Sequence, residues 1–518
     1  MIGATGSSSL VSSCKSSESE SDSKTIALGG SAVLFASAFG NGLNYAFGIF
    51  LARMLGPDDF GLYALALTIF NMVSLTVVFG MDVGAIKFVS HHLVTAQQAK
   101  ARESVIAAAA LAFGSGLLAA IGMGLFAHPI AVTFYNKPGL VSALLAFALA
   151  IPLATVASVL ISASQAFQTV RSTILIKYLW EPIAKFVFAA LALWAGFQLL
   201  GVLISIVLTL VVSAALAITA AYRLVFSRSD RFLVWNAQEA RTLLTYCMPL
   251  AVSNLFGVVA PRSDILILGY WANAQEVGVY LAAFQTAAII SLVLGAFITG
   301  SAPIISRAWS QQDRSRMRQT YQSVSRLSII VALPIFSCFI IFADEILALF
   351  GPKFSTGSTA LMFLAFGQIF NAATGPANTV LLMSGHSRLV MTNTMIMGVV
   401  LFAATAIIIP YGGMTGAAIA ASTTFILTTL LRVIQVWRLH QVQPYTWGLT
   451  KPLTATAASA GIVLLMMHHP AIMLPTPLLG LLLGIFYLSG LLLLGIHHDD
   501  RLVLQSLLAG VRNMLGKG

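Results

Sequence analysis

Ionisable side chains inside long apolar runs are the residues of this sequence best able to do chemistry. Glu181 and Lys185 lie near the middle of one run, and Arg262 lies in another, directly after Pro261. A charge at the centre of a membrane helix costs about 2.5–3.5 kcal/mol on insertion scales. Residues that carry such a charge therefore usually bind a substrate or an ion, or pair with one another.

Glu181 and Lys185 are four residues apart, in the Glu-then-Lys order that favours pairing on one helix face. One interpretation is a structural ion pair that faces the interior of a helix bundle. The other is a role in binding a substrate or an ion. Asp82 and Glu181 are also the carboxylates that could couple transport to a proton or sodium gradient.

Arg262 lies a few residues from the predicted middle of its helix. Asp264 is two positions further on and so lies on a different helix face, where it is poorly placed to pair with Arg262. Pro261 cannot donate a backbone hydrogen bond and so frees the carbonyl of Gly257. An arginine beside a broken helix suits an anionic group such as a phosphate, which it binds in a forked geometry. The alternative is that Arg262 pairs with a carboxylate on another helix or extends towards the membrane surface.

Uncharged polar side chains recur at helical spacing in several apolar runs. Such a stripe favours either a wet cavity wall that binds sugar hydroxyls or hydrogen bonds that hold helices together, and both interpretations stay open. The residues are Asn41 and Asn44; Thr155, Ser158, Ser162 and Gln165; and Gln368, Asn371 and Asn378, which are expected to share one helix face with Gly375.

Motifs of enzymes are missing from the sequence. It has no phosphate-binding loop, no nucleophile elbow, no His-Glu-x-x-His and no Asp-x-Asp of the nucleotide-sugar type. The three histidine pairs are each made of adjacent residues, which rarely bind one metal. We therefore expect no enzyme activity, no catalytic residue, no metal and no cofactor.

The composition predicts an integral membrane protein that crosses the bilayer many times. Of 518 residues, 58% are hydrophobic and only 9% are charged, and the mean hydropathy is +0.91. Soluble domains are about 25% charged. The Ser-rich residues 1–25 are expected to form a disordered cytoplasmic tail.

About fourteen apolar segments are long enough to cross a bilayer as helices. If both ends of the chain are cytoplasmic, 23 of the 28 Lys and Arg residues fall in cytoplasmic segments, as the positive-inside rule requires. The excess charge is spread over these segments, so nucleic-acid binding is not expected. The segments are 27–52, 61–86, 103–127, 140–167, 173–195, 199–222, 243–270, 277–305, 321–343, 358–384, 389–410, 414–436, 450–467 and 477–496.

A repeated phrase divides the chain into two similar halves. Residues 55–66 (LGPDDFGLYALA) and 272–283 (ANAQEVGVYLAA) share a Gly-x-Tyr step after a polar pair, 217 positions apart. We expect an all-α fold of two parallel six-helix repeats, residues 26–240 and 241–440, followed by two extra helices and a cytoplasmic tail in 441–518. Parallel repeats of this kind place a substrate site between the halves, near the membrane midplane.

Residues 51–90 (LARMLGPDDFGLYALALTIFNMVSLTVVFGMDVGAIKFVS) resemble bacterial polysaccharide-export proteins of the O-antigen flippase (Wzx) type. Residues 243–280 (LLTYCMPLAVSNLFGVVAPRSDILILGYWANAQEVGVY) do so as well, and the resemblance covers roughly residues 26–440. These proteins belong to the superfamily that holds multidrug/toxin extrusion (MATE) proteins and the lipid II flippase.

The resemblance implies a two-lobed flippase in the inner membrane that moves an undecaprenyl-pyrophosphate-linked oligosaccharide to the outer leaflet for surface polysaccharide, such as the O-antigen of lipopolysaccharide. It implies a cationic cavity between the lobes, and Arg262 and Lys185 fit such a cavity. The expected partners are the lipid-linked oligosaccharide, membrane lipids, and a polysaccharide polymerase and chain-length regulator.

Two other functions stay open. A cation-coupled multidrug exporter of the same superfamily would use Asp82 or Glu181 for coupling. A membrane glycosyltransferase or polymerase is less well supported, because such enzymes usually carry a large outward loop or a catalytic domain. No predicted outward loop exceeds about 16 residues, which is far below the size of a domain.

Overall fold

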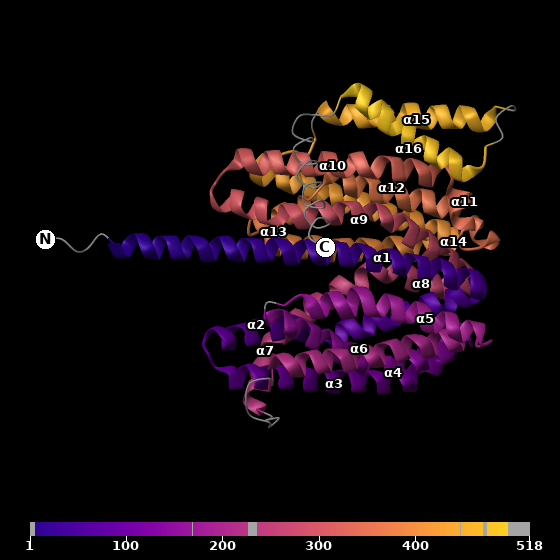
Figure 1. Ribbon diagram of the computed structural model, residues 1–518. Coiled ribbons are helices and arrows are strands. Elements are labelled where there is room, and N and C mark those ends of the chain that lie inside the picture. The colour runs from indigo at the N-terminus through magenta and orange to yellow at the C-terminus, as the bar shows by residue number, and fades with distance from the viewer. Residues whose placement is uncertain (1–5, 168, 226–235, 446, 470–473, 496–518) are drawn as a thin grey trace. The chain divides into compact units, whose positions relative to one another are not determined.

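Every regular element in the described part of the chain is a helix, as the need to satisfy backbone hydrogen bonds inside a bilayer requires (Figure 1). The structure is a computed structural model that describes residues 6–167, 169–225, 236–445, 447–469 and 474–495. The side chains of 6–31, 34, 225, 249–250, 252–256, 258–260 and 296 are outside the description, and so are the histidine pair and the basic residues of 496–518.

The chain forms two compact units. Unit 1 comprises residues 1–47, 73–124 and 146–251, and unit 2 comprises residues 48–72, 125–145 and 252–518. Residues 48–72 and 125–145, which lie early in the sequence, thus pack with the second half of the chain. Unit 1 in turn includes the first part of the seventh expected membrane helix, up to Ala251.

Unit 1 contains the start of α1 (Gly6–Val77) and most of the helices before residue 251. The backbone is already helical from Gly6, within the segment for which the sequence predicts a disordered tail. The other elements are α2 (Met81–Val94), α3 (Gln98–His128), α4 (Leu140–Ala166), the π-helix η2 (Thr173–Trp180), α5 (Glu181–Trp194), α6 (Leu199–Val225) and α7 (Ala237–Val259).

Unit 2 contains the middle of α1 and all elements after α7. Its short elements are the π-helix η1 (Pro129–Phe134) and the 3-10 helices η3 (Ala260–Arg262), η4 (Pro352–Gly357) and η5 (Trp447–Leu449). Its α-helices are α8 (Ser263–Trp271), α9 (Ala274–Ser310), α10 (Arg314–Ile341), α11 (Ala343–Ala348), α12 (Ser358–Thr374), α13 (Ala377–Met383), α14 (Ser387–His440), α15 (Thr450–His468) and α16 (Thr476–Leu494).

Nine helical stretches within the described residues are long and apolar enough to cross a membrane. Two of them, Phe35–Val94 with 60 residues and Ser387–His440 with 54, far exceed the 20 or so residues that one crossing needs. Each bends at a glycine with positive φ, Gly56 (77°) before Pro57 and Gly413 (51°) after Pro410. Each therefore supplies two of the expected spans.

Three further expected spans are built from consecutive shorter pieces. They are η2 with α5, α7 with η3 and α8, and α12 with α13. An all-helical membrane protein is confirmed, and a total of fourteen spans stays a prediction. Breaks inside membrane helices are tolerated where neighbouring groups satisfy the freed backbone. One such group is Ser115 of α3, whose hydroxyl donates to the carbonyl of Val77 at the end of α1 (3.0 Å).

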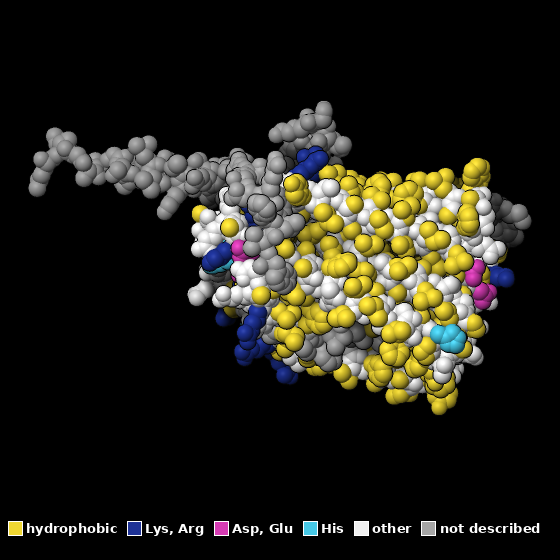
Figure 2. All heavy atoms as spheres, turned by 90° about the horizontal axis from the view of Figure 1, so that it is seen from below, with side chains coloured by type: hydrophobic (Ala, Val, Ile, Leu, Met, Phe, Trp, Pro, Cys, Tyr) yellow, Lys and Arg dark blue, Asp and Glu magenta, His cyan; other side chains and the backbone are white. Residues whose placement is uncertain are grey.

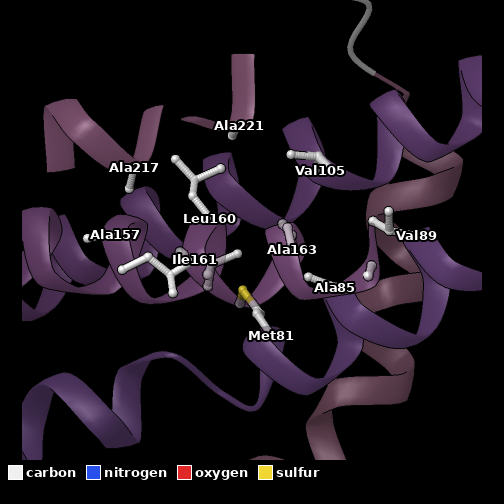
Figure 3. Close-up of a cluster of buried hydrophobic side chains, with 14 of the residues drawn as sticks. Met81, Ala85, Val89, Val105, Ala157, Leu160, Ile161, Ala163, Ala217 and Ala221 are labelled. Atoms are coloured by element: carbon white, nitrogen blue, oxygen red, sulfur yellow. The ribbon is translucent and has the colours of Figure 1, made fainter. Parts of the chain in front are cut away.

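Small side chains let the helices of unit 1 approach one another closely. Its main apolar cluster is rich in alanine and joins α2, α3, α4, α6 and α7, with Met81, Leu160 and Ile161 among its larger members (Figure 3). A side chain at Gly84 would meet the sulfur of Cys247 at 2.6 Å. Cys247 and Cys338 are free thiols within helices, and Cys247 is buried.

The surface fits a protein that is surrounded by lipid. The face in Figure 2 is mainly hydrophobic, and Lys and Arg side chains gather towards one end of it. Exposed side chains along the helices include Leu118, Leu125 and Leu149, which are 69–73% exposed. Hydrophobic side chains this exposed would be costly in water but are at no disadvantage in contact with hydrocarbon.

The two copies of the repeated phrase touch each other at their glycines, inside unit 2. A side chain at Gly61 of α1 would collide with the carbonyl oxygen of Ala274 and lie 3.0 Å from the amide nitrogen of Gly278. A side chain at Gly278 of α9 would collide with the carbonyl oxygen of Pro57 and lie 3.2 Å from the Cα of Gly61. We call this contact the glycine crossing. It requires glycine because backbone meets backbone.

The glycine crossing predicts that Gly61→Ala and Gly278→Ala each destabilise the protein. The added methyl group meets backbone atoms that cannot move aside, and overpacking of this kind costs about 1–3 kcal/mol. Thermal unfolding of the purified protein in detergent, followed by size-exclusion chromatography, measures the loss. Gly114→Ala in α3 is the control, because a side chain there has no neighbour within 4 Å. Equal stability of all three variants would contradict the crossing.

Candidate functional site

Arg262 lies where the seventh expected span changes direction. It ends η3 and precedes α8, with φ −116° and ψ 5°, which is outside the helical region. Pro261 at the same break prevents α7 from continuing. The half-buried guanidinium lies over the ring of Phe284 of α9, with Cζ 6.0 Å from the ring centroid. This distance is at the outer limit of a cation–π contact.

Asp264, two residues further on, is fully buried and accepts no hydrogen bond from Arg262 within the described part of the chain. Its Oδ2 accepts a hydrogen bond of 2.6 Å from the hydroxyl of Tyr280 in α9, and its Oδ1 accepts one of 2.8 Å from the amide of Ile265. The hydrogen bond between Tyr280 and Asp264 was not predicted from the sequence. The signal was present, because Tyr280 is the tyrosine of the repeated Gly-x-Tyr step.

The far end of α8 is held by a lysine from a distant part of the chain. The ammonium of Lys137 donates to the carbonyls of Gly269 (2.6 Å), Ala272 (2.8 Å) and Tyr135 (3.3 Å). The carbonyls at a helix C-terminus have no partner within the helix, so a cation there satisfies them. Burial lowers the pKa of Lys137.

In unit 1, Glu181 and Lys185 lie along a close contact between α1 and the fifth expected span. A side chain at Gly40 would meet the carbonyl oxygen of Tyr178 at 2.7 Å. Two turns further along α1, the ring of Phe47 lies 6.0 Å from that of Phe186 and 5.2 Å from the ammonium of Lys185. Lys185 is thus directed towards α1.

Glu181 is the first residue of α5 and is half-buried. Two lysines one turn away on either side, Lys177 and Lys185, are close enough to its carboxyl to act on it electrostatically. The sequence predicted a pair of Glu181 with Lys185 and did not include Lys177. The alternation of Lys, Glu and Lys along one helix face leaves an excess of one positive charge, which suits an anionic ligand better than an isolated pair does.

Asn41 and Asn44 lie on the part of α1 that contains Gly40 and Phe47. Asn41 is exposed and Asn44 is half-buried. The Oδ1 atom of Asn44 is buried and makes no hydrogen bond to any described residue. A buried amide oxygen without a partner usually accepts from a water molecule or a ligand.

Asp82 lies in the first turn of α2, after a sharp break in the second span. Phe79 (φ 51°) and Gly80 (φ 73°) adopt left-handed backbone there. Asp82 faces Cys247 of α7 closely enough to interact with it electrostatically, and its Oδ1 is buried without a hydrogen-bond partner among the described residues. The position suits a group that takes up an ion or a proton.

The predicted stripe of Gln368, Asn371 and Asn378 does not share one helix face, and this expectation was wrong. The helix α12 ends at Thr374, Gly375 has φ 61° and ψ −149°, and α13 starts anew at Ala377. The break separates Asn378 from the other two residues. Its Oδ1 is also buried without a partner in the described structure.

Gln368 bridges two helices. It is 6% exposed, and its Oε1 accepts a hydrogen bond from the hydroxyl of Ser291 in α9. Thr155 of the other stripe does the same, donating to the carbonyl of Ala112 in α3 (3.0 Å). Gln165 is exposed and contacts Thr173. These contacts support the interhelical interpretation for Gln368 and Thr155.

The candidate residues thus form two groups, each within one unit. Unit 1 brings Asn44, Phe47, Glu181 and Lys185 along the contact of α1 with α5, and unit 2 places Arg262 at the start of α8. Within the described residues, no three His, Cys, Asp or Glu side chains come together as a metal site would need.

A family model described as "Polysaccharide biosynthesis protein" matches residues 50–358. The chain belongs to this family. The matched range begins just before the first copy of the repeated phrase and ends at the start of α12, so it includes the glycine crossing and Arg262.

Curated relatives of this family member come from distant organisms. The succinoglycan biosynthesis transport protein ExoT of Rhizobium meliloti is 22% identical over 86% of this chain and 87% of its own length. A "probable low-salt glycan biosynthesis flippase", Agl15 of Haloferax volcanii, is 26% identical over 38% of this chain, and the match covers 41% of that protein.

Solved structures show the same fold. The lipid II flippase MurJ in an inward closed conformation superposes with a TM-score of 0.71 over 88% of this chain and 97% of its own, at 12% identity. An inward-facing MATE family multidrug transporter gives 0.66 over 79% and 98%, at 15% identity. The expected fold, that of MATE proteins and flippases, is confirmed, and so is the expected membership of a polysaccharide biosynthesis family.

Gln368→Ala is expected to lower the stability of the protein, because it leaves the hydroxyl of Ser291 without its partner between two helices. The loss of a buried hydrogen bond costs about 1–3 kcal/mol. Thermal unfolding in detergent measures it. The exposed Gln165→Ala serves as the control, and an equal loss in both variants would show that Gln368 does not hold α12 to α9.

Proposed function

We propose that this protein is a flippase that moves an undecaprenyl-pyrophosphate-linked oligosaccharide from the cytoplasmic to the outer leaflet of the inner membrane. The observation that carries the proposal is the arginine at the break of the seventh span. Asp264, the acid nearest to Arg262 in sequence, accepts its hydrogen bonds from Tyr280 and Ile265. Arg262 donates no hydrogen bond to Asp264 among the described residues, and we infer that its N–H groups bind an anionic ligand.

A pyrophosphate suits this position chemically. Its oxygens carry more than one negative charge and match the paired N–H groups of a guanidinium. The Lys177–Glu181–Lys185 series of unit 1, with its excess positive charge, would supply a second cationic group. Asn41, Asn44, Asn371 and Asn378 would bind sugar hydroxyls, and the unpartnered oxygens of Asn44 and Asn378 support this role. Gln368 is the weakest of these proposed contacts, because it already bonds to Ser291.

We further infer transport by alternating access between two six-helix lobes, residues 26–240 and 241–440. The repeated phrase, the named activities of the flippase relatives and the fold shared with MurJ support this mechanism. The distribution of Lys and Arg supports cytoplasmic termini. A polymerase and a chain-length regulator would then use the translocated oligosaccharide.

Arg262→Ala is expected to abolish surface polysaccharide while leaving the amount of protein in the membrane unchanged. Loss of a hydrogen bond to a charged group costs about 1.5–3 kcal/mol, which is roughly a tenfold to hundredfold loss of affinity. Polysaccharide display in a deletion strain that carries the variant measures the effect, and a membrane blot measures abundance.

The exposed Arg241→Ala is the matched control, because Arg241 lies on the same span but far from the break. Normal display with Arg262→Ala in a correctly inserted protein would refute the role of Arg262.

A second candidate function, a cation-coupled multidrug exporter, is favoured by one observation. The unpartnered Oδ1 of Asp82 beside a broken span would suit a proton or sodium ion. If this function is correct, Asp82→Asn increases the sensitivity of cells to toxic cations and leaves polysaccharide display normal. If the flippase uses Asp82 or Glu181 for coupling, the same variant reduces display instead, and drug sensitivity does not change.

A further inference from the structure

The hydrogen bond between Asp264 and Tyr280 holds a buried carboxylate two residues from Arg262. Asp264 is 1% exposed and Tyr280 is fully buried, so their hydrogen bond of 2.6 Å lies in a low-dielectric environment. A buried carboxylate that loses a donor needs another partner, because an uncompensated buried charge is strongly destabilising. The nearest cation along the chain is Arg262, whose charge already acts on Asp264 electrostatically.

We propose that Tyr280 is a positioning residue: by binding the carboxylate of Asp264, it keeps the guanidinium of Arg262 available to the pyrophosphate of the substrate. This inference rests on the proposed function and assigns a role to two residues that do not touch the substrate. Arg262 has a non-helical backbone and precedes Asp264 by two residues, so the two side chains belong to one short segment at the start of α8.

The position of Tyr280 is itself fixed by the glycine crossing. Tyr280 follows Gly278 by two residues in α9, and Gly278 lies against Pro57 and Gly61 of α1. The hydroxyl of Tyr280 can therefore reach only a narrow region, and Asp264 lies within it. At its other end α8 is held by Lys137. The segment that carries Asp264 is thus fixed at both ends.

The two copies of the repeated phrase share the tyrosine but differ in the residues that precede it. Tyr63, the counterpart of Tyr280, is also buried (6% exposed) and packs against Phe60 with ring centroids 6.0 Å apart. The residue 217 positions before Asp264 is Phe47, which has no carboxylate. The tyrosine occupies the same position of the repeated phrase in both copies, but only the second copy has an acid and an arginine at the positions of Asp264 and Arg262 before it.

The test is a set of variants in the purified full-length protein. The probe is a short-chain citronellyl-pyrophosphate-linked disaccharide, and the same disaccharide on citronellyl alcohol serves as the neutral reference. Binding is measured by microscale thermophoresis in detergent. Tyr280→Phe is expected to weaken binding of the pyrophosphate probe about tenfold or more, because Asp264 then captures Arg262. Binding of the neutral reference stays unchanged.

The decisive variant is the double change Tyr280→Phe with Asp264→Asn. An amide has no charge and cannot compete for the guanidinium, so the pyrophosphate affinity is expected to return to within about threefold of the original. Asp264→Asn alone keeps an acceptor for Tyr280 and is also expected to bind normally. In an Arg262→Ala background, Tyr280→Phe is expected to cause no further loss, because residues that act through one another are not additive.

The other outcomes distinguish the alternatives. If the double variant binds worse than Tyr280→Phe, the pair is only structural and the inference is wrong. If Tyr280→Phe binds the pyrophosphate probe as tightly as the unaltered protein, Asp264 does not capture Arg262 when its donor is lost, and the positioning role is refuted. If Arg262→Ala itself leaves pyrophosphate binding unchanged, Arg262 does not bind the pyrophosphate. The proposed function then loses its binding residue, independently of the result for Tyr280.

Discussion

The contact of Gly61 with Gly278 is the constraint on which the arrangement of unit 2 depends. Two helix backbones meet there without intervening side chains, so the relative position of α1 and α9 is fixed closely. Because α9 also carries Tyr280 and Phe284, the crossing determines where the carboxylate of Asp264 and the guanidinium of Arg262 find their partners. The repeated phrase is thus a structural element: its glycine fixes the position of α9, and its tyrosine binds Asp264.

Several membrane spans of this protein are interrupted, and side chains satisfy backbone groups near the ends of their helices. Membrane helices that stop and restart leave backbone groups without partners, and this chain satisfies them with side chains. Ser115 donates to the carbonyl of Val77. Lys137 and Arg53 lie between predicted spans, in predicted loops that are outward if both ends of the chain are cytoplasmic. Lys137 donates to carbonyls at the end of α8, and Arg53 donates to the carbonyl of Leu349 (2.6 Å). Two exceptions to the positive-inside pattern therefore have structural reasons.

Much of the fold followed from the sequence because bilayer thickness and backbone hydrogen bonding leave few choices. The all-helical fold and the break at Pro261 were predictable in this way, whereas the total of fourteen spans stays a prediction. The break at Gly375 was not, because a glycine within an apolar run fits an unbroken helix equally well. The Asp264–Tyr280 bond also escaped prediction, since it joins residues 16 apart across a turn and depends on how α9 packs. The roles of the candidate residues stay predictions.

Lys137 has a consequence for how sequences of this family can diverge. Outer loops of membrane proteins usually tolerate substitution and insertion. Here the ammonium of one loop residue is shared by three carbonyls, two of them belonging to a segment 132 and 135 positions away. An insertion beside Lys137 would shift that ammonium and release the end of α8. Among descendants of this protein, the length of the loop at 135–139 should drift less than that of other exposed connections.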